Sequence, residues 1–189
     1  MVLSFILITS CFALWGFAND VTNPMVKAFS KIFRMSVTEG AMVPVVFYLG
    51  YFVMALPAAL FIQRHSFKAG VMLGLTLFAI GSLLFLPARA WGLYAPFLLA
   101  YFVLTCGLSF IETSCNPYIY SMGSEETATR RLNLAQAFNP IGNLVGMWAA
   151  MRFVQEQMDP LSSVARFGLP EEEFNLVKDQ DFGVLIQLP

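Results

Sequence analysis

Charge is what this sequence lacks most. Only 12% of its 189 residues are Asp, Glu, Lys or Arg, while 58% are hydrophobic. A soluble domain usually carries about 25% charged residues, roughly twice this share. A soluble surface is hard to build from so few charges, so the composition indicates a protein whose solvent is largely lipid. The net charge of −1 gives no sign of the basic surface by which proteins bind nucleic acid.

Residues that carry chemistry are also scarce. The three cysteines (Cys11, Cys106 and Cys115) lie in apolar runs without metal-ligand spacing. They are interpreted as small buried hydrophobes and not as a disulfide framework. His65, the single histidine, lies in a short basic loop and is expected to be solvated. The sequence contains no zinc motif, Gly-rich phosphate loop or nucleophile elbow, so we expect neither an enzyme nor a bound cofactor.

Long hydrophobic runs are abundant instead. A helix that spans a bilayer needs about 20 mostly apolar residues. Five stretches qualify, at roughly 2–25, 41–62, 69–86, 94–122 and 132–154, and a sixth begins near Phe182. Short connections make neighbouring spans antiparallel, so we expect an all-α membrane bundle over residues 1–189. Because the sixth run is cut off, we expect this chain to be a piece of a longer protein.

Small residues recur within these runs. Gly70 and Gly74 are four residues apart, as are Gly142 and Gly146. In lipid, helices pack closely through such small faces. These glycines therefore predict helix–helix contacts and not a functional site.

The first span carries an unexpected carboxylate, Asp20. An ionisable group at mid-membrane costs at least about 2.5–3.5 kcal/mol on insertion scales, so such residues tend to face a cavity or a partner. Trp15, Asn19 and Asn23 recur every four residues beside Asp20 and share one helix face. An aromatic face that packs on sugar C–H groups, with amides and a carboxylate for the hydroxyls, suits a polyol.

The alternative for this stretch is structural. Asn19 and Asp20 would then cap the end of a helix near the membrane surface, which the nearby Pro24 and Lys27 would allow.

Glu112 is the second carboxylate, and it lies in the fourth span about eight residues before Gly123. Asn116 follows it by one turn on the same face. A surrounding of low dielectric constant favours the neutral carboxyl, which suits a proton carrier. The alternative is a structural glutamate that is hydrogen-bonded between helices.

An amide stripe follows the fifth span. Asn133, Gln136, Asn139 and Asn143 are spaced by three, three and four residues. Such amides either hold helices together or bind sugar hydroxyls without a fixed charge. The tyrosines of the second span, Tyr48 and Tyr51, are interpreted mainly as packing residues that could also line a cavity.

Three segments resemble one known family. They are "FALWGFANDVTNPMVKAF", "FYLGYFVMALPAALFIQRHSFKAG" and "GLSFIETSCNPYIYSMGSEETATRRLNLAQAFNPIGNLVG". They are similar to the L-fucose:proton symporter family of the major facilitator superfamily, which also contains glucose/galactose transporters. The stretch from Glu112 to Asn139 is the most specific part. Within the family, the three segments are most similar to those of fucose permeases from Bacteroidetes-type gut bacteria.

The resemblance implies a fold and a function. It implies twelve transmembrane helices in two halves, of which this chain is most of the N-terminal one, and a monomer in the bacterial inner membrane with its amino terminus in the cytoplasm. The C-terminal half of the same transporter and the lipid bilayer would be its partners. The whole protein would move L-fucose or a related hexose together with a proton by alternating access. The alternatives are a glucose/galactose transporter, sodium-coupled or not, and a non-transporting membrane sensor.

The resemblance also implies which residues form the functional site. The family's key carboxylates are an aspartate in the first helix and a glutamate in the fourth, and Glu112 matches the glutamate. With Trp15 and Asn19 aligned, the family aspartate falls at Asn23, so Asp20 stands one turn away and is hypothesised to take over its task. Proton coupling is thereby assigned to Glu112 and Asp20. Sugar binding is assigned to Asp20, Asn23, Asn19, Trp15, Asn116, Gln136 and Asn139. Pro44 stands where close relatives often carry glutamine.

Overall fold

The chain is helical, as its hydrophobic pattern predicts. A computed structural model describes residues 2–185, without the side chains of residues 2, 22, 23, 37 and 185. The described part contains no strand. The helices are α1 (Val2–Ile32), α2 (Val37–Gly40), α3 (Met42–Arg64), α4 (Phe67–Trp91), α5 (Tyr94–Ser121), α6 (Ala128–Gln136), α7 (Phe138–Ala150), α8 (Ser163–Phe167) and α9 (Glu171–Leu185). A 3₁₀ turn, η1 (Glu125–Thr127), and a π-helical turn, η2 (Met151–Gln155), complete them.

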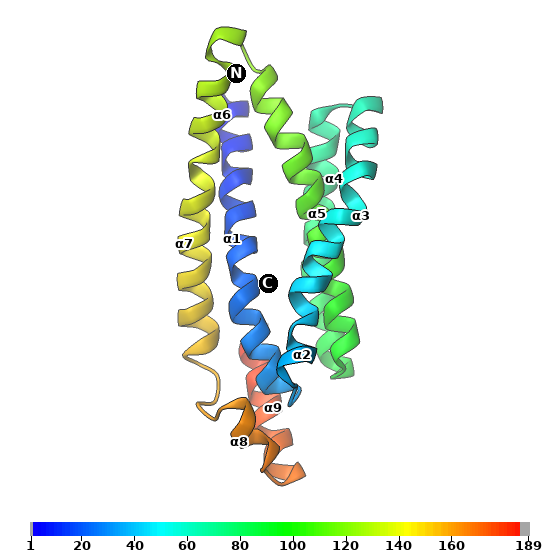
Figure 1. Cartoon of the computed structure of the whole chain (residues 1–189), viewed down its shortest axis with the longest axis vertical. Helices are drawn as coiled ribbons and strands as arrows, with labels where there is room; N and C mark the ends of the chain where they lie inside the picture. The colour runs from blue at the N-terminus through cyan, green and yellow to red at the C-terminus, as the bar shows by residue number, and fades with distance from the viewer. Residues whose placement is uncertain (1, 186–189) are drawn as a thin grey trace.

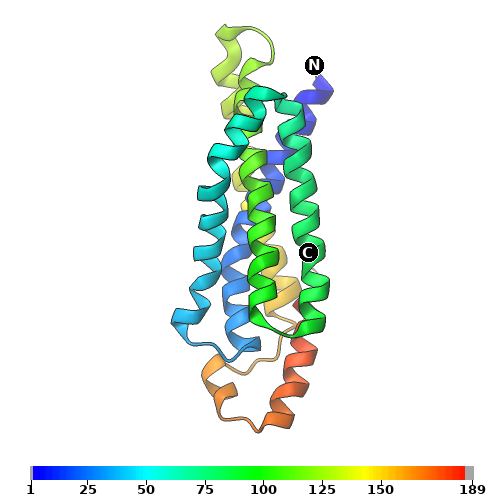
Figure 2. The same cartoon turned by 90° about the vertical axis from the view of Figure 1, so that its right-hand side faces the viewer.

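The long helices form two packed groups. Helix α1 lies against α7, and α5 packs between α3 and α4, as Figures 1 and 2 show. Contacts between α1 and α5 join the two groups. The short helices α8 and α9 lie at the end of the bundle where α1 finishes, opposite the N-terminus (Figure 1). The two groups therefore meet mainly through α1 and α5, with further contacts between α1 and α3.

Glycines permit the closest helix contacts. A Cβ atom on Gly146 of α7 would lie 2.5 Å from the carbonyl oxygen of Phe17 in α1, and one on Gly142 would overlap the carbonyl of Ala13. Between α4 and α5, a Cβ on Gly74 would lie 2.9 Å from the carbonyl oxygen of Gly107. The predicted role of the small residues in helix packing is confirmed.

Within residues 2–185, four helical segments are long and apolar enough to cross a membrane. They are Leu3–Ile32, Thr38–Arg64, Phe67–Trp91 and Tyr94–Ser121, and they overlap the first four predicted spans. The tight turns between them have local causes. The Ser66 hydroxyl accepts a hydrogen bond from the backbone N–H of Ala69 (3.1 Å) and so caps α4. Gly92, with φ of 62°, takes the left-handed conformation that ends this helix.

The first helix is longer than predicted. It was expected to end near residue 25, but α1 continues through Pro24 to Ile32. Asp20 therefore lies in the interior of a helix, and the alternative in which Asn19 and Asp20 cap a helix end is wrong. Because proline has no N–H, Pro24 leaves the backbone carbonyl of Asp20 without its usual helical donor.

The fifth predicted span is not one continuous helix. Helix α6 ends at Gln136, Ala137 interrupts the helix, and α7 then continues into the π-helical turn η2. Pro140 lies three residues after the break. It cannot donate to the carbonyl of Gln136, and its ring crowds that carbonyl, which explains the interruption. That residues 132–154 cross the bilayer as a unit stays a prediction.

The start of the sixth span lies partly outside the described residues. Helix α9 begins at Glu171, earlier than the expected start near Phe182. Phe182 is buried near its end and stacks on Phe97 of α5, with ring centroids 5.6 Å apart. Residues 186–189, which would continue the apolar run, are not described.

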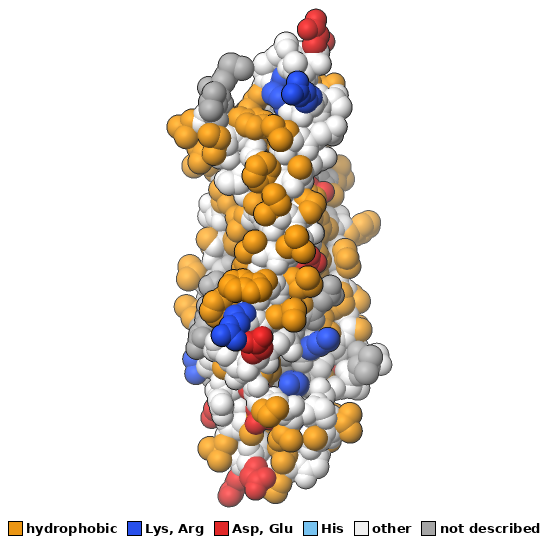
Figure 3. Space-filling model, turned by 90° about the vertical axis from the view of Figure 1, so that its left-hand side faces the viewer, with side chains coloured by type: hydrophobic (Ala, Val, Ile, Leu, Met, Phe, Trp, Pro, Cys, Tyr) orange, Lys and Arg blue, Asp and Glu red, His pale blue; other side chains and the backbone are white. Residues whose placement is uncertain are grey.

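The surface fits a lipid environment. On the face shown in Figure 3, hydrophobic side chains cover the middle of the molecule and most charged side chains gather toward its two ends. Large apolar residues are highly exposed along the helices, among them Leu3 (70%), Phe52 (81%) and Leu144 (64%). Aqueous solvent disfavours so much exposed apolar area, whereas lipid tails match it.

Candidate functional site

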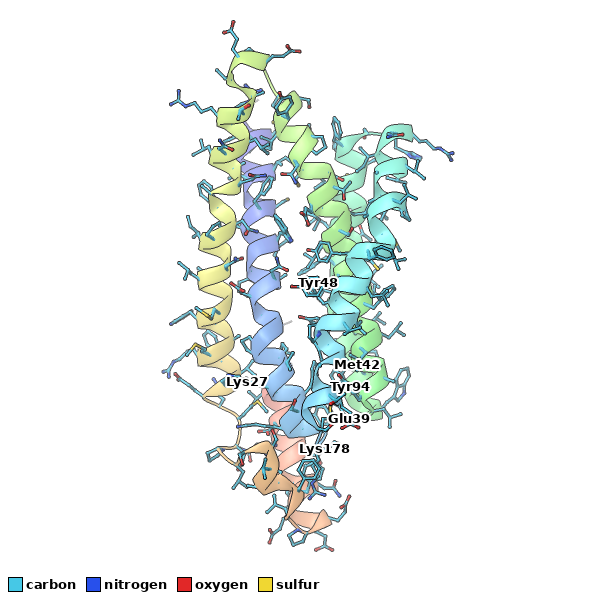
Figure 4. All side chains as sticks on the ribbon, in the orientation of Figure 1. Lys27, Glu39, Met42, Tyr48, Tyr94 and Lys178 are labelled. Carbon is cyan, nitrogen blue, oxygen red and sulfur yellow. The ribbon has the colours of Figure 1, made fainter. Side chains whose placement is uncertain are left out.

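One cavity of about 460 Å³ lies between the two helix groups. Its wall includes Trp15, Asn19 and Asp20 from α1 and Glu112 from α5. The remaining lining residues are Pro44, Phe47, Tyr48 and Tyr51 from α3 and Asn143 from α7. In Figure 4, Tyr48 projects from α3 toward α1. The volume lies in the range of about 300–1,000 Å³ that is usual for small-molecule sites.

The cavity brings the two predicted carboxylates together. Asp20 and Glu112 are both half-buried. Within the described part of the chain, neither carboxylate forms an ion pair. The hydrogen bond from the Asn116 side chain to Glu112 is accepted by the backbone carbonyl of Glu112 and not by its carboxylate. The alternative of a glutamate hydrogen-bonded between helices therefore finds no support in these contacts. Carboxylates placed this way need water, a proton or a ligand as their partner.

An aromatic wall stands beside the carboxylates. The indole N–H of Trp15 donates a hydrogen bond of 2.6 Å to the Tyr51 hydroxyl, from α1 to α3. The edge of the Trp15 ring also meets Phe12, with centroids 6.3 Å apart. On α3, Phe47 packs against Tyr51 with centroids 5.3 Å apart. These contacts fix the orientation of the indole, which is the planar surface that packs against apolar C–H groups.

Three predicted amides lie near the cavity but bond to the protein. Gln136 Nε2 donates to Asn116 Oδ1 (2.9 Å), and Asn116 Nδ2 donates to the backbone carbonyl of Glu112 (3.1 Å). Asn139 Nδ2 donates to the carbonyl of Phe12 (3.3 Å). None of the three lines the cavity. Their contacts fit the alternative in which the amides hold helices together, and direct contact with a sugar stays a prediction for them.

The side chain of Asn23 lies outside the described residues, so its predicted role also stays a prediction. Asn143, by contrast, lines the cavity although it was not among the predicted site residues. In the amide orientation that satisfies both neighbours, its nitrogen donates to the carbonyls of Gly16 (2.7 Å) and Asn139 (3.2 Å). Asn143 is the fourth member of the predicted stripe, so the spacing already pointed to it.

Sequence reasoning underestimated the contribution of α3. Its four cavity residues, from Pro44 to Tyr51, are spaced by three, one and three, which places them on one helix face. An apolar or aromatic stripe of this kind is common in ordinary helix packing, so the pattern alone does not separate a cavity wall from a core. The polar hydroxyls at its end, on Tyr48 and Tyr51, were the available signal.

The family follows from comparison with known proteins. A sequence model of the Major Facilitator Superfamily matches residues 6–157. The chain belongs to this superfamily. It is 52% identical to an L-fucose-proton symporter of Haemophilus influenzae over 158 residues, which are 84% of this chain and 37% of the relative. It is 37% identical to a glucose/galactose transporter of Brucella abortus over 138 residues, which are 73% of this chain and 34% of the relative.

A solved member of the superfamily shares the fold. The crystal structure of the Escherichia coli fucose:proton symporter matches with a TM-score of 0.84 and 29% identity, over 100% of this chain and 45% of that one. The predicted resemblance to fucose permeases and the predicted fold class are confirmed; the Bacteroidetes origin stays a prediction. The chain spans less than half the length of these relatives. It is part of a multi-pass protein of the bacterial inner membrane.

Proposed function

We propose that the whole protein is a proton-coupled symporter of L-fucose or a related hexose. The observation that carries this proposal is the cavity between the two helix groups, which combines two carboxylates, amides and a fixed indole. A carboxylate accepts hydrogen bonds from sugar hydroxyls, and an aromatic face packs on the C–H side of the ring. Similarity to L-fucose-proton symporters supports the choice of sugar and of coupling ion.

Glu112 is the proposed proton carrier. Protonation neutralises Glu112, whose charge is costly away from water. The transporter can then pass through the intermediate states in which the cavity is closed to both sides of the membrane. Asp20, Asn19 and Trp15 line the same cavity and would bind the sugar, and Asp20 would also link sugar to proton. Asn23 would join this face of α1. Asn116, Gln136 and Asn139 would complete the polar surroundings.

Transport requires more than this chain. The cavity is walled on one side by the helices described here, and the C-terminal half of the same polypeptide would supply the opposite wall. The two halves would rock about the bound sugar, which is alternating access. The proposed transporter is a monomer in the lipid bilayer, with its amino terminus in the cytoplasm. It uses the proton as coupling ion without a further cofactor, catalyses no covalent reaction and binds no nucleic acid.

A glucose/galactose transporter is the second candidate function. The similarity to the Brucella abortus glucose/galactose transporter favours it. In that case D-glucose or D-galactose would be carried, with a proton or with sodium. Uptake in sodium-free buffer, with and without a proton uncoupler, separates these couplings. A sensor that does not transport would show no concentrative uptake of any hexose.

The direct test is sugar-dependent proton movement. Cells that contain the full-length protein in weakly buffered medium receive L-fucose, D-galactose or D-glucose, and the external pH is recorded. The proposal predicts alkalinisation on addition of L-fucose, which an uncoupler abolishes. Uptake of L-fucose without any pH change would contradict proton coupling, and alkalinisation by D-galactose alone would favour the second candidate.

A further inference from the structure

Tyr51 lies where the proposed sugar site and the proposed proton site meet. Its hydroxyl oxygen accepts the hydrogen bond from the Trp15 indole at 2.6 Å. The Glu112 carboxylate interacts electrostatically with the same phenol, and all three side chains line one cavity. Tyr51 therefore contacts the aromatic wall and lies within the field of the carboxylate.

The hydrogen bond from Trp15 leaves the phenol proton free. An indole N–H is a donor only, whereas a tyrosine hydroxyl is both a donor and an acceptor. Tyr51 uses a lone pair for Trp15, so its own O–H is still available. No described residue accepts that proton in the structure. Half-buried hydroxyl groups of this kind seek an acceptor, and the acceptors in this cavity are the carboxylates and the hydroxyls of a bound sugar.

The two partners of this bond belong to different helix groups. Trp15 is on α1, which packs against α7, and Tyr51 is on α3, which packs against α5. The Ser109 hydroxyl of α5 donates to the backbone carbonyl of Tyr51 (3.5 Å), which helps to fix the register between α3 and α5. The Trp15–Tyr51 hydrogen bond thus joins the two groups at the wall of the cavity.

We propose that Tyr51 is a positioning residue that couples sugar binding to the protonation of Glu112. Its oxygen holds the Trp15 indole in place. Its O–H donates to Glu112 when that group is ionised, because a carboxylate is the stronger acceptor. When Glu112 is protonated, the O–H turns to a sugar hydroxyl. Sugar therefore binds more tightly to the protonated form, and by linkage bound sugar favours protonation. This inference rests on the proposed function.

Other titratable groups near Glu112 are few. Asp20 faces the cavity from α1, and Tyr48 and Tyr51 face it from α3. The ionisable residues of α4, Lys68 and Arg89, lie in its first and last turns. On α6, Arg130 and Arg131 lie in its first turn, beside the loop from α5. Asp20 is thus the other carboxylic acid among the described residues that line the cavity, and the test below is repeated with Asp20→Asn to separate the effect of Asp20 from that of Glu112.

The test measures the affinity of the full-length protein for radiolabelled L-fucose from mildly acidic to mildly alkaline pH. D-Galactose is the probe if the parent transports only that sugar. Tyr51→Phe keeps the ring and removes the hydroxyl. It removes the hydrogen bond to Trp15 at every pH, which lowers the affinity by a factor independent of pH, and it is expected to weaken binding about three- to tenfold more at acidic than at alkaline pH, as the loss of one further hydrogen bond does. Tyr120→Phe, an exposed tyrosine outside the cavity, should leave the profile unchanged.

A second variant isolates the link to Glu112. In a Glu112→Gln background, where the partner cannot ionise, Tyr51→Phe should weaken binding by the same factor at every pH. The inference is overturned if Tyr51→Phe in the otherwise unchanged protein has no effect, or has an equal effect at acidic and alkaline pH, while the parent still cotransports sugar and protons. A parent that binds neither sugar, or binds with no dependence on pH, would instead overturn the proposed function itself.

Discussion

Arg166 and Asp181 form an ion pair that is completely buried at the end of the bundle. Arg166 Nη1 lies 2.7 Å from Asp181 Oδ2, outside hydrogen-bond alignment, and neither side chain is exposed. The guanidinium also donates to the carbonyls of Lys31 (3.3 Å), Leu161 (3.3 Å) and Asp159 (3.2 Å). Asp181 Oδ1 accepts from the backbone N–H of Asp159 (2.9 Å). This network ties α8 and α9 to the end of α1.

Removing one partner of this pair should destabilise the protein strongly. Arg166→Met leaves the Asp181 carboxylate buried without its counter-charge, which typically costs about 3–5 kcal/mol. The melting temperature of the full-length protein in detergent should fall clearly. Arg152→Met is the control, since Arg152 and its partner Glu156 are exposed (64% and 54%) and such pairs contribute only about 0–1 kcal/mol. Equal melting temperatures for the two variants would show that the buried network does not hold this end together.

The contact between α1 and α7 should not tolerate a methyl group at Gly142. A Cβ there would overlap the carbonyl of Ala13. Overpacking of this kind typically costs about 1–3 kcal/mol, which exceeds the gain of about 1 kcal/mol in helix propensity. We expect Gly142→Ala to lower the melting temperature and the transport rate together. Gly168→Ala is the matched control, because its Cβ would lie at an ordinary 3.6 Å from the Ala165 carbonyl oxygen. A Gly142→Ala protein as stable as this control would be evidence against the close packing.

Asn116 and Gln136 should behave as one unit. Their side chains share a 2.9 Å hydrogen bond, so removal of Gln136 takes the donor from Asn116 Oδ1 and removal of Asn116 takes the acceptor from Gln136 Nε2. A double-mutant cycle of Asn116→Ala and Gln136→Ala, measured as thermal stability, should give a coupling of about 0.5–1.5 kcal/mol. Transport should be impaired to a similar degree in all three variants. Independent effects on stability, together with multiplied effects on transport, would mean that each amide contacts the sugar separately.

Much of this architecture was predictable from the sequence, and the exceptions have local causes. The length and apolarity of the first four runs anticipated α1, α3, α4 and α5. Pro24 was misleading, because proline in a long buried helix can be accommodated when neighbouring groups serve the freed carbonyls. A long-range contact also forms at this proline, because the Gln155 side chain of η2 donates to the Pro24 carbonyl (2.7 Å), although the carbonyl that the proline frees is that of Asp20. That contact spans 131 residues and has no signature in the local pattern.

The candidate site was likewise predictable from the sequence only in part. Asp20 and Glu112 were found because a carboxylate in an apolar span is conspicuous, and both line the cavity. The role of Tyr51 depends on a hydrogen bond between α1 and α3, which helical periodicity within either segment does not reveal. The pairing of Asn116 with Gln136 depends likewise on how α5 meets α6.

Asp20 should matter for sugar transport. Asp20→Asn keeps the size of the side chain but removes its charge in the cavity. We expect L-fucose uptake by the full-length protein to fall markedly, at least tenfold, which corresponds to about 1.4 kcal/mol or more of lost binding or coupling. Asn23→Ala is the companion variant, since the family resemblance implies that the family aspartate aligns with residue 23. Normal transport by Asp20→Asn, together with no transport by Asn23→Ala, would show that transport depends on Asn23 and that Asp20 has not taken over the task of the family aspartate.

The central claim concerns the proton at Glu112, and one measurement tests it most directly. Full-length protein with Glu112→Gln is reconstituted in liposomes, and L-fucose accumulation driven by a proton gradient is compared with exchange of labelled for unlabelled L-fucose at equal concentrations. The glutamine mimics the protonated carboxyl but cannot release a proton. The account predicts that accumulation is abolished while exchange continues. Accumulation at the parent rate would contradict it, because the proton would then have to travel by another residue.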